Sequence, residues 1–476
     1  MDTEKVLNFF REITRIPRES GHEEQIIAYL QQFAAARGLE CKTDKVGNVM
    51  IARPASKGCE NRPTVVLQGH TDMVCEKKST SGFDFSKDPI QYVIEDGWMI
   101  AHDTTLGADN GIGVATAMAI LDDDSLEHPR VECLFTVSEE TGLDGARAVK
   151  KGFVTGKILI NLDDEDEGCF CVGCAGGMDT VGTFTYREKK LMAGSVVTKF
   201  TIGGGQGGHS GDDIDKGRIN GVQQLARFTN ETLRFNVDVC SIAAGNKRNA
   251  IARGGEVVLA IPARAEDKVV ALFNDFAARL KAEYAVTDPG LNFRAEPVEW
   301  EGGAIDRGTA RRLIRALIAV PHGVTAMSAD IPGLIETSTN LASVKMEAGR
   351  RIVVGTMQRS SVNSQRIFLS ERVAAVLELA GAKVKHSDGY PGWKPNMNSY
   401  VKDVCVASYK RLFGREPVVR AIHAGLECGL FTEKFPDMDM IAFGPTLRGV
   451  HAPGERLDLA SLDRFLAVLL DVLKTI

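Results

Sequence analysis

Apolar residues recur along the chain in two spacings, and the spacing changes from one segment to the next. The first forty residues have the period of amphipathic helices, over 3–15 and 22–38. Beyond them the pattern alternates: it predicts strands at 64–67, 131–137 and 158–160 and a helix at 110–121. This alternation predicts an α/β domain with a mixed, mostly parallel central sheet and helices on both faces.

The pattern changes over residues 189–388, which we interpret as an inserted α+β domain of two similar modules. The first module has helices at 219–233 and 266–284 around a strand at 256–261, after a start at Val197. The second starts at Leu291 and has helices at 309–318 and 364–380 and strands at 341–346 and 352–357. The α/β pattern then returns, with strands at 418–422 and 440–443 and a helix at 459–473. We therefore predict one discontinuous α/β domain from 1–188 and 389–476.

Composition and charge narrow the class of protein. The 57 basic and 63 acidic residues give a net charge of −6, which argues against a nucleic-acid partner. No apolar run is long enough for a transmembrane helix, and the charged N-terminal segment has no signal-peptide core. Ten cysteines in 476 residues do not form a disulfide scaffold. We expect a reduced, cytoplasmic protein with no membrane partner.

Histidine and acidic residues follow the predicted strands of the α/β domain. They are His70, Asp109, Glu139-Glu140, Asp163 and His451. Each motif alone is more often structural, but ligand sites of α/β sheets gather beyond the carboxyl ends of strands. With one glutamate of the Glu139-Glu140 pair, these residues offer two imidazoles and three carboxylates, which suit Zn²⁺ and similar ions. Five such ligands suit two metal ions if one carboxylate bridges them.

Four longer motifs resemble the co-catalytic zinc exopeptidases, and among them the aminoacyl-histidine dipeptidases. The motifs are His70-Thr71-Asp72-Met73-Val74-Cys75-Glu76-Lys77, Thr105 to Gly113, Ser138-Glu139-Glu140-Thr141-Gly142 and Gly207-Gly208-His209-Ser210-Gly211. The similarity extends over nearly the whole chain. It implies the zinc exopeptidase fold, with a metal-binding catalytic domain at 1–188 and 389–476 and a lid domain at 189–388.

The resemblance also implies a role for each residue of the acidic and histidine cluster. Asp109 matches the bridging carboxylate, with a cis peptide bond often found after it. Glu140 and His451 match the other ligands of one zinc ion, and His70 and Asp163 those of the second ion. Glu139 matches the general base. Asp72 matches the residue that orients His70, as metal-bound histidines generally need.

Further candidates lie in and beside the predicted lid. By resemblance, His209 donates a hydrogen bond to the oxyanion, and Arg359 binds the free carboxylate of the substrate, a task that suits a planar guanidinium. Asn249 is a further substrate-binding candidate, although relatives often have Asn-x-Ile-Pro where this chain has Asn249-Ala250-Ile251-Ala252. His423 and Gly425 match a substrate-facing loop, and Gly425 could offer its backbone N–H to the carboxylate.

The implied activity is metal-dependent hydrolysis of unblocked dipeptides, including Xaa-His dipeptides. A water activated by two metal ions would attack the peptide carbonyl, with Glu139 as the base. Zinc is the favoured metal, with manganese or cobalt as alternatives, and a small peptide is the expected partner. A deacylase or carboxypeptidase that acts on N-acyl amino acids stays open as an alternative. A homodimer also stays open, although two modules in one chain could mimic internally the lid pair of dimeric members.

Three rival interpretations are weaker. A dinucleotide site fails because Gly111-Ile112-Gly113 is followed by Thr116 where the fingerprint needs glycine. A metal or redox site at Cys169, Cys171 and Cys174 lacks a fourth ligand of the usual spacing, and the alternation there favours a strand. An inactive scaffold is disfavoured because all seven matching positions of the site are present.

Overall fold

The computed structural model describes residues 1–476, and the chain divides into two compact units. Unit 1 comprises Met1–Cys174, Trp393–Ala421 and Leu426–Ile476. Unit 2 comprises Ala175–Gly392 and Ile422–Gly425. The sequence prediction set the corresponding boundaries at 188/189 and 388/389. No helix is both long and apolar enough to cross a membrane.

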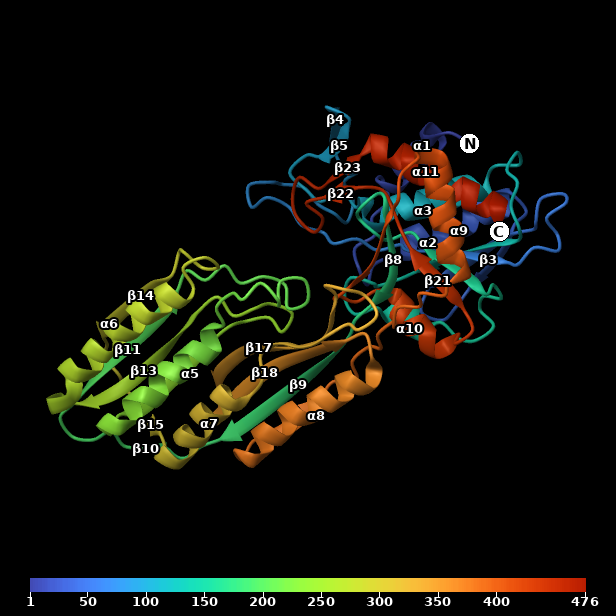
Figure 1. Cartoon of the computed structure of the whole chain (residues 1–476). Coiled ribbons are helices and arrows are strands. Elements are labelled where there is room, and N and C mark those ends of the chain that lie inside the picture. Colours follow the sequence, from blue (N-terminus) through green and yellow to red (C-terminus); the bar gives the residue numbers. More distant parts are fainter. The chain divides into compact units, whose positions relative to one another are not determined.

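Unit 1 is built around one eight-stranded sheet (Figure 1). In sheet order its strands are β1 (Glu40–Thr43), β2 (Val49–Arg53), β6 (Val131–Thr136), β3 (Val65–His70), β7 (Ile158–Asn161), β21 (Asp439–Ala442), β8 (Cys169–Cys174) and β20 (Val418–Ile422). The four central strands β6, β3, β7 and β21 run parallel, whereas β1 with β2, β2 with β6, and β21 with β8 pair antiparallel. The predicted α/β class with a mixed sheet is confirmed.

Buried residues lie on both faces of this sheet. Every residue of β3 and β6 is buried. Val65 and Leu67 belong to the core that joins the sheet to five of the helices, while Val66 between them is buried on the other face. The helices of unit 1 are α1 (Thr3–Ile13), α2 (Glu24–Ala36), α3 (Ala108–Leu121), α4 (Asp144–Ala148), α9 (Tyr400–Phe413), α10 (Glu427–Lys434) and α11 (Leu459–Thr475).

Aspartates begin the first and last helices of unit 1. The side chain of Asp2 accepts a hydrogen bond from the backbone N–H of Lys5, and Asp458 accepts from Ala460 and Ser461. Such caps satisfy N–H groups that the first turn of a helix leaves free. Unit 1 also contains a small sheet that was not predicted. In sheet order its strands are β22 (Leu447–Arg448), β23 (Arg456–Asp458), which directly precedes α11, β5 (Trp98–Ala101) and β4 (Tyr92–Glu95).

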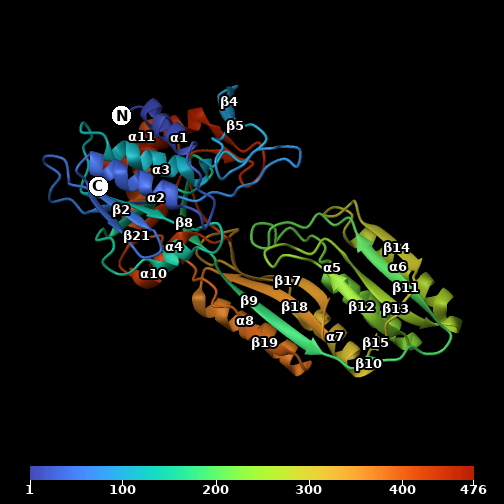
Figure 2. The same ribbon diagram turned by 180° about the vertical axis from the view of Figure 1, so that it is seen from behind.

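Unit 2 is an antiparallel sheet with one layer of helices (Figure 2). The sheet order is β14 (Asn292–Pro297), β11 (Ser195–Gly203), β13 (Gly255–Pro262), β12 (Asp238–Ala244), β17 (Ile335–Glu347), β18 (Arg351–Ser360), β9 (Gly176–Thr185) and β19 (Lys383–His386), with β16 (Gly323–Met327) on β17. Helices α5 (Gly221–Thr232), α6 (Glu266–Glu283), α7 (Arg307–Ala319) and α8 (Asn363–Leu379) share one core with it. The short strands β10 (Glu188–Lys189) and β15 (Ala304–Ile305) pair separately.

The two halves of the unit 2 sheet meet weakly, and their composition differs from the predicted modules. Strands β12 and β17 are aligned only at Ala244 and Val344. The segment after Leu291, expected to open the second module, forms β14 and pairs with β11 of the first half. The second half instead takes β9, which precedes the first module in the chain and pairs with β18. Strand pairing, which the apolar pattern does not encode, decides this exchange.

Candidate metal centre

Parallel strands bring the predicted metal ligands to one edge of the unit 1 sheet. His70 ends β3 and is aligned with Thr136 at the end of β6, and Asn161 ends the neighbouring β7. Because carboxyl ends of parallel strands meet at one edge, the next residues along the chain converge there. Those residues are Glu139, Glu140 and Asp163.

The carboxylate of Asp109 lies between two imidazoles. Its Oδ1 is 3.1 Å from Nε2 of His70, and its Oδ2 is 3.0 Å from Nε2 of His451. The same nitrogen of His451 lies 2.9 Å from Oε1 of Glu140, and Nε2 of His70 lies 3.5 Å from Oδ1 of Asp163. The structure thus brings all five predicted metal ligands together.

The backbone turns sharply where Asp109 enters the cluster. Gly107 has a φ of 68°, and a Cβ atom there would lie 2.8 Å from the sulfur of Met73. Only glycine fits this conformation and this space without strain. The peptide bond between Asp109 and Asn110 is cis, as the resemblance implied. This turn sets Asp109 into the first turn of α3, facing the two histidines.

The donor set fits divalent metal ions. Ligand atoms of His70, Asp109 and Glu140 all lie within 4.8 Å of one another. Burial raises the pKa of Asp109, but hydrogen bonds with His451 and His70 outweigh that effect and hold this pKa well below its usual range. Hydrogen bonds with Asp109 and Glu140 raise the pKa of His451 to about 11. Carboxylates thus favour protons on the imidazoles, and a metal ion that binds here replaces those protons.

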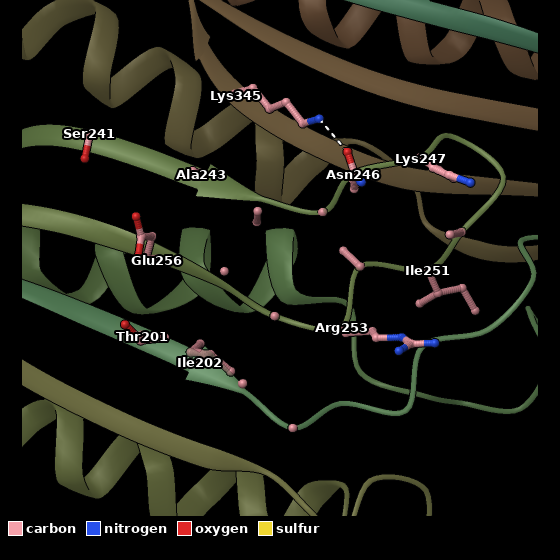
Figure 3. Close-up of a pocket in the computed structure, with 18 of the residues that line it drawn as sticks. Thr201, Ile202, Ser241, Ala243, Asn246, Lys247, Ile251, Arg253, Glu256 and Lys345 are labelled. Atoms are coloured by element: carbon pink, nitrogen blue, oxygen red, sulfur yellow. Dashed lines mark hydrogen bonds between the residues drawn. The ribbon is translucent and has the colours of Figure 1, made fainter. Parts of the chain in front are cut away.

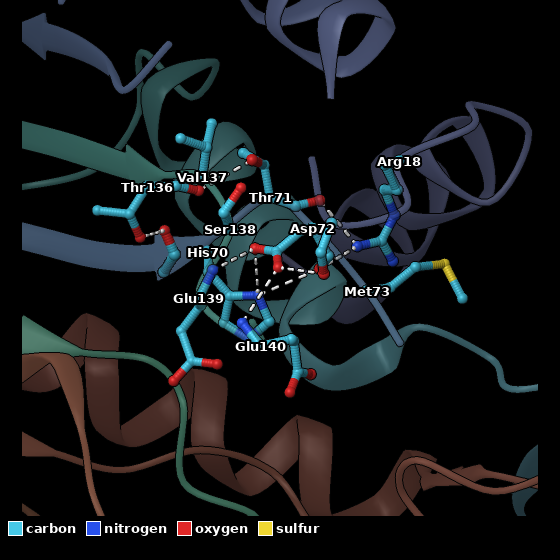
Figure 4. Close-up of polar contacts among 12 residues, drawn as sticks. Arg18, His70, Thr71, Asp72, Met73, Thr136, Val137, Ser138, Glu139 and Glu140 are labelled. Carbon is cyan, nitrogen blue, oxygen red and sulfur yellow. Dashed lines mark hydrogen bonds and ion pairs between the residues drawn. The ribbon is translucent and has the colours of Figure 1, made fainter. Parts of the chain in front are cut away.

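Asp72 connects the ligand His70 to the Glu139–Glu140 turn (Figure 4). Its carboxylate is fully buried and accepts hydrogen bonds from the backbone N–H groups of Glu139 at 3.0 Å and Glu140 at 3.2 Å, and from the hydroxyl of Ser20 at 2.7 Å. Nδ1 of His70 lies 3.3 Å away. Burial raises the pKa of Asp72, but His70 and these donors lower it to about 2. Asp72 therefore stays ionised and orients His70.

Glu139 has a different environment from its neighbour Glu140. Its side chain makes no hydrogen bond, and in Figure 4 its carboxylate points away from Asp72. Burial raises the pKa of Glu139 well above its ordinary value, against the lowering effect of His70. A carboxylate with free oxygens, fixed only through its backbone, is available to exchange protons with a molecule in the site.

In unit 2, Arg359 is a buried cation. Its hydrogen-bonding partners are two hydroxyl groups and one imidazole, and none of them is a carboxylate. The side chain is 3% exposed and contacts the hydroxyl of Ser210 at 3.2 Å, the hydroxyl of Tyr390 at 3.0 Å and Nε2 of His209 at 3.2 Å. Nδ1 of His209 lies 3.0 Å from a carboxylate oxygen of Asp212. A buried arginine without an ion-paired carboxylate is suited to receive an anionic ligand.

The other predicted lid residues surround this arginine. His423 is buried, its Nε2 lies 2.7 Å from the hydroxyl of Ser338, and burial and Arg359 lower its pKa to about 3. Gly425 packs against Tyr390, since a Cβ atom there would lie 2.8 Å from the tyrosine ring. The carbonyl of Asn249 accepts a hydrogen bond from the N–H of Ser210 at 2.8 Å. His423 is therefore a neutral imidazole in this group.

Sequence reasoning missed three groups beside these sites, of which Glu455 and Glu427 are buried. Glu455 lies in the turn after His451, and Tyr390 lies in a Gly-Tyr-Pro-Gly segment interpreted only as a boundary. Glu427 is fully buried, accepts from Gln68 at 2.5 Å and Thr136 at 2.8 Å, and burial raises its pKa to about 7. The available signal was that Glu455 lies four residues after His451 and Glu427 two residues after Gly425, whereas Tyr390 lies near no predicted site residue in the sequence.

Two other features do not join the site. Cys169, Cys171 and Cys174 lie in strand β8, all ten cysteines are free, and burial raises the pKa of Cys174 to about 11. Unit 2 contains a pocket of about 1010 Å³ (Figure 3). Lys247 and Arg253, from the connection between β12 and β13, line it together with residues of β11, β12, β13 and β17. Its lining includes none of the predicted metal ligands and none of the predicted substrate-binding residues.

Comparisons with known proteins agree with the geometry. Residues 66–475 match the model of peptidase family M20/M25/M40. The cytosol non-specific dipeptidase of Escherichia coli is 38% identical over 470 residues, covering 98% of this chain and 97% of that protein. The structure of an aminoacylhistidine dipeptidase from Vibrio alginolyticus is 38% identical with a TM-score of 0.90, covering 99% of this chain and 96% of that one.

A more distant structure shares the fold alone. The aminopeptidase PepT from Bacillus cereus has a TM-score of 0.58 at 15% identity, covering 100% of this chain and 98% of that one. The family match covers most of the chain, from β3 to α11, and includes every predicted metal ligand. By its sequence and its fold, the chain belongs to peptidase family M20.

Proposed function

We propose that the chain is a metal-dependent dipeptidase that hydrolyses unblocked dipeptides, including Xaa-His dipeptides. The observation that carries the proposal is the carboxylate of Asp109 between His70 and His451, with Glu140 and Asp163 beside them. The names of the Escherichia coli and Vibrio alginolyticus relatives support the choice of substrate, because the chain matches both over nearly its full length.

Two divalent ions complete this centre. We assign His70 and Asp163 to one ion, Glu140 and His451 to the other, and Asp109 to both. Zinc is the ion that this donor set favours, and manganese or cobalt are alternatives. When bound, such a pair of ions supplies the Lewis acidity that polarises a carbonyl and lowers the pKa of water.

Glu139 is the proton carrier of the reaction. It takes a proton from the attacking water, whose oxygen forms the new bond to the peptide carbon. It then gives that proton to the peptide nitrogen as the C–N bond breaks, so that two amino acids leave. Asp72 holds Glu139 for this task through its backbone N–H, at 3.0 Å, and orients His70 at the same time.

The residues around Arg359 in unit 2 bind the substrate. Arg359 pairs with the free carboxylate of the dipeptide, because it is buried and lacks an ion-pair partner. The N–H of Gly425 adds a second donor to that carboxylate. His209 donates to the developing oxyanion, and Asn249 and His423 are further substrate-binding residues. Nη2 of Arg359 lies 3.2 Å from Nε2 of His209, so the proposed carboxylate and oxyanion donors are neighbours.

The expected cytoplasmic location is supported by the free cysteines and by the name of the Escherichia coli relative. A homodimer stays a prediction.

The test is hydrolysis of a small panel by chelator-treated and metal-restored protein. The panel contains Ala-His, β-Ala-His, Ala-Ala, a tripeptide and an N-acetylated dipeptide. We expect cleavage of the free dipeptides only with metal, and little cleavage of the tripeptide or the blocked substrate. Cleavage of the blocked substrate alone would instead identify a deacylase or carboxypeptidase with the same metal centre.

A further inference from the structure

Glu455 is a buried carboxylate that holds the loop of the proposed bridging ligand. It is 2% exposed. Its Oε2 accepts from the backbone N–H groups of Leu106 at 2.8 Å and Gly107 at 3.0 Å. Its Oε1 accepts from those of Ala108 at 2.8 Å and Asp109 at 3.3 Å. One carboxylate thus satisfies four consecutive N–H groups that the start of α3 cannot pair internally.

Arg18 holds the same loop from its carbonyl side. The guanidinium is 2% exposed and donates to the carbonyl of Gly107, and its other arm donates to the carbonyls of Thr71 and Asp72 at 3.0 Å (Figure 4). Arg18 therefore ties the segment after His70 to the loop before Asp109. Glu455, four residues beyond His451, ties that loop to the His451 turn.

We propose that Glu455 is a positioning residue that fixes Asp109 relative to His451, with Arg18 doing the same relative to His70. Neither residue touches a proposed ligand side chain, so each acts through the backbone. The inference rests on the proposed metal centre, because it concerns how the chain pre-arranges that centre. It adds two residues to the five ligands and explains how loops more than 300 residues apart in sequence keep a common geometry.

The substitution Glu455→Gln tests whether Glu455 positions the Asp109 loop or only fills space. It has the shape of glutamate but only one acceptor oxygen, and its amide N–H₂ would face two of the four N–H donors. Water cannot replace the lost acceptor at a site that is 2% exposed. The loop must then move, and the Asp109 carboxylate moves with it. Partners of metal ligands typically change metal affinity about 10–100-fold when lost.

The matched control is Glu132→Gln. Glu132 is also a fully buried carboxylate that accepts backbone N–H groups, from Thr155 at 2.6 Å and Gly156 at 3.2 Å, but it holds no ligand loop. Both variants lose a buried acceptor of the same type. Only a positioning role makes the metal affinity of Glu455→Gln fall further than that of Glu132→Gln.

The experiment measures the zinc dissociation constant by competition with a chromogenic chelator, alongside thermal unfolding of the metal-free proteins. We expect at least about tenfold weaker binding in Glu455→Gln and near wild-type binding in Glu132→Gln. At saturating zinc, KM for Ala-His should stay near wild type while kcat falls. If Glu455→Gln does not fold, Glu455→Asp, whose carboxylate is one methylene too short, takes its place.

Equal zinc affinity in the Glu455 variant and the wild type would overturn the inference, as would an equal loss in Glu132→Gln. These outcomes leave the proposed function intact. Failure of the wild-type protein to bind zinc, manganese or cobalt would instead refute the metal centre itself, and the inference with it.

Discussion

At the scale of single residues, neighbouring carboxylates of the site differ in what holds them. Glu140 contacts His451 at 2.9 Å, whereas the side chain of the adjacent Glu139 makes no hydrogen bond. Asp72 accepts from the backbone of both. The same turn therefore holds one carboxylate against His451 and leaves the other without a partner, so the proposed roles of metal ligand and base can be separated by substitution.

Glu139→Gln should keep both metal ions and lose most turnover. Glutamine preserves the size of the side chain but cannot carry the proton, a function worth about 10²–10⁴-fold in rate. Metal content by atomic absorption and kcat for Ala-His check this. Glu140→Gln is the control, since it should lose metal affinity as well. A variant at position 139 with nearly wild-type kcat would refute its role as base.

Arg359→Met should raise KM for free dipeptides and remove the preference for a free carboxylate. Loss of a desolvated charge pair costs about 2–5 kcal/mol, roughly 30-fold or more in kcat/KM. The measurement compares Ala-Ala with its C-terminal amide in both proteins. Arg279→Met, which removes an ion pair with Glu231 on the lid surface, is the control. Unchanged discrimination between acid and amide in Arg359→Met would show that another group binds the carboxylate.

At the scale of elements, the sequence predicts best where a strand is buried on both faces. The continuous apolar runs of β3, β6 and β7 were recognisable, and the ligands follow their ends because a parallel sheet collects those ends. Short elements such as β4, β22 and α10 span too few residues to show a repeated apolar period and were not predicted. The composition of each half of the unit 2 sheet was also missed, because pairing between strands leaves no trace in the period of either strand.

Long-range partners of the site residues were equally out of reach. Glu455 contacts backbone N–H groups 346–349 residues away. Any residue at 106–109 would offer the same N–H groups, so the partner residues carry no signal. Arg359 shows the same limit. Its role was assigned by resemblance, but the sequence did not predict that the hydroxyl of Tyr390 contacts it.

Phe228→Ala should destabilise unit 2 and leave the metal centre unchanged. Phe228 on α5 packs against Phe200, Phe273 and Phe276, with ring centroids 4.9–5.6 Å apart. Truncation of a buried phenylalanine costs about 3–5 kcal/mol. Chemical denaturation gives the free energy of unfolding, and chelator competition gives the zinc affinity. Phe368→Ala, at a position 54% exposed, is the control and should change stability by about 0.5 kcal/mol at most.

At the scale of the whole molecule, two separate hydrophobic cores stabilise the two units. All five proposed metal ligands belong to unit 1, and the buried Arg359 group belongs to unit 2. Ligands that bind one unit should therefore stabilise that unit first. This separation allows the metal centre and the substrate-carboxylate site to be studied by independent unfolding signals.

Metal restoration should raise the unfolding temperature of unit 1 alone. A metal ion at 100 times its dissociation constant stabilises the folded state by about 2.7 kcal/mol. Calorimetry of chelated and zinc-restored protein should show this shift, and the Asp109→Ala variant should not show it. A zinc-dependent shift confined to the unfolding of unit 2 would contradict the assignment of the ligands.

The central sheet of unit 1 contains a strand from the far side of the insertion. Strand β21, at 439–442, lies between β7 and β8, both of which precede unit 2 in the chain. On the ribosome, the contiguous residues 175–392 are complete before β21 is synthesised. All residues of unit 2, including Ile422–Gly425, are therefore synthesised while the sheet of unit 1 still lacks the strand between β7 and β8. The proposed metal centre is also incomplete at that stage, because His451 follows β21 in the chain.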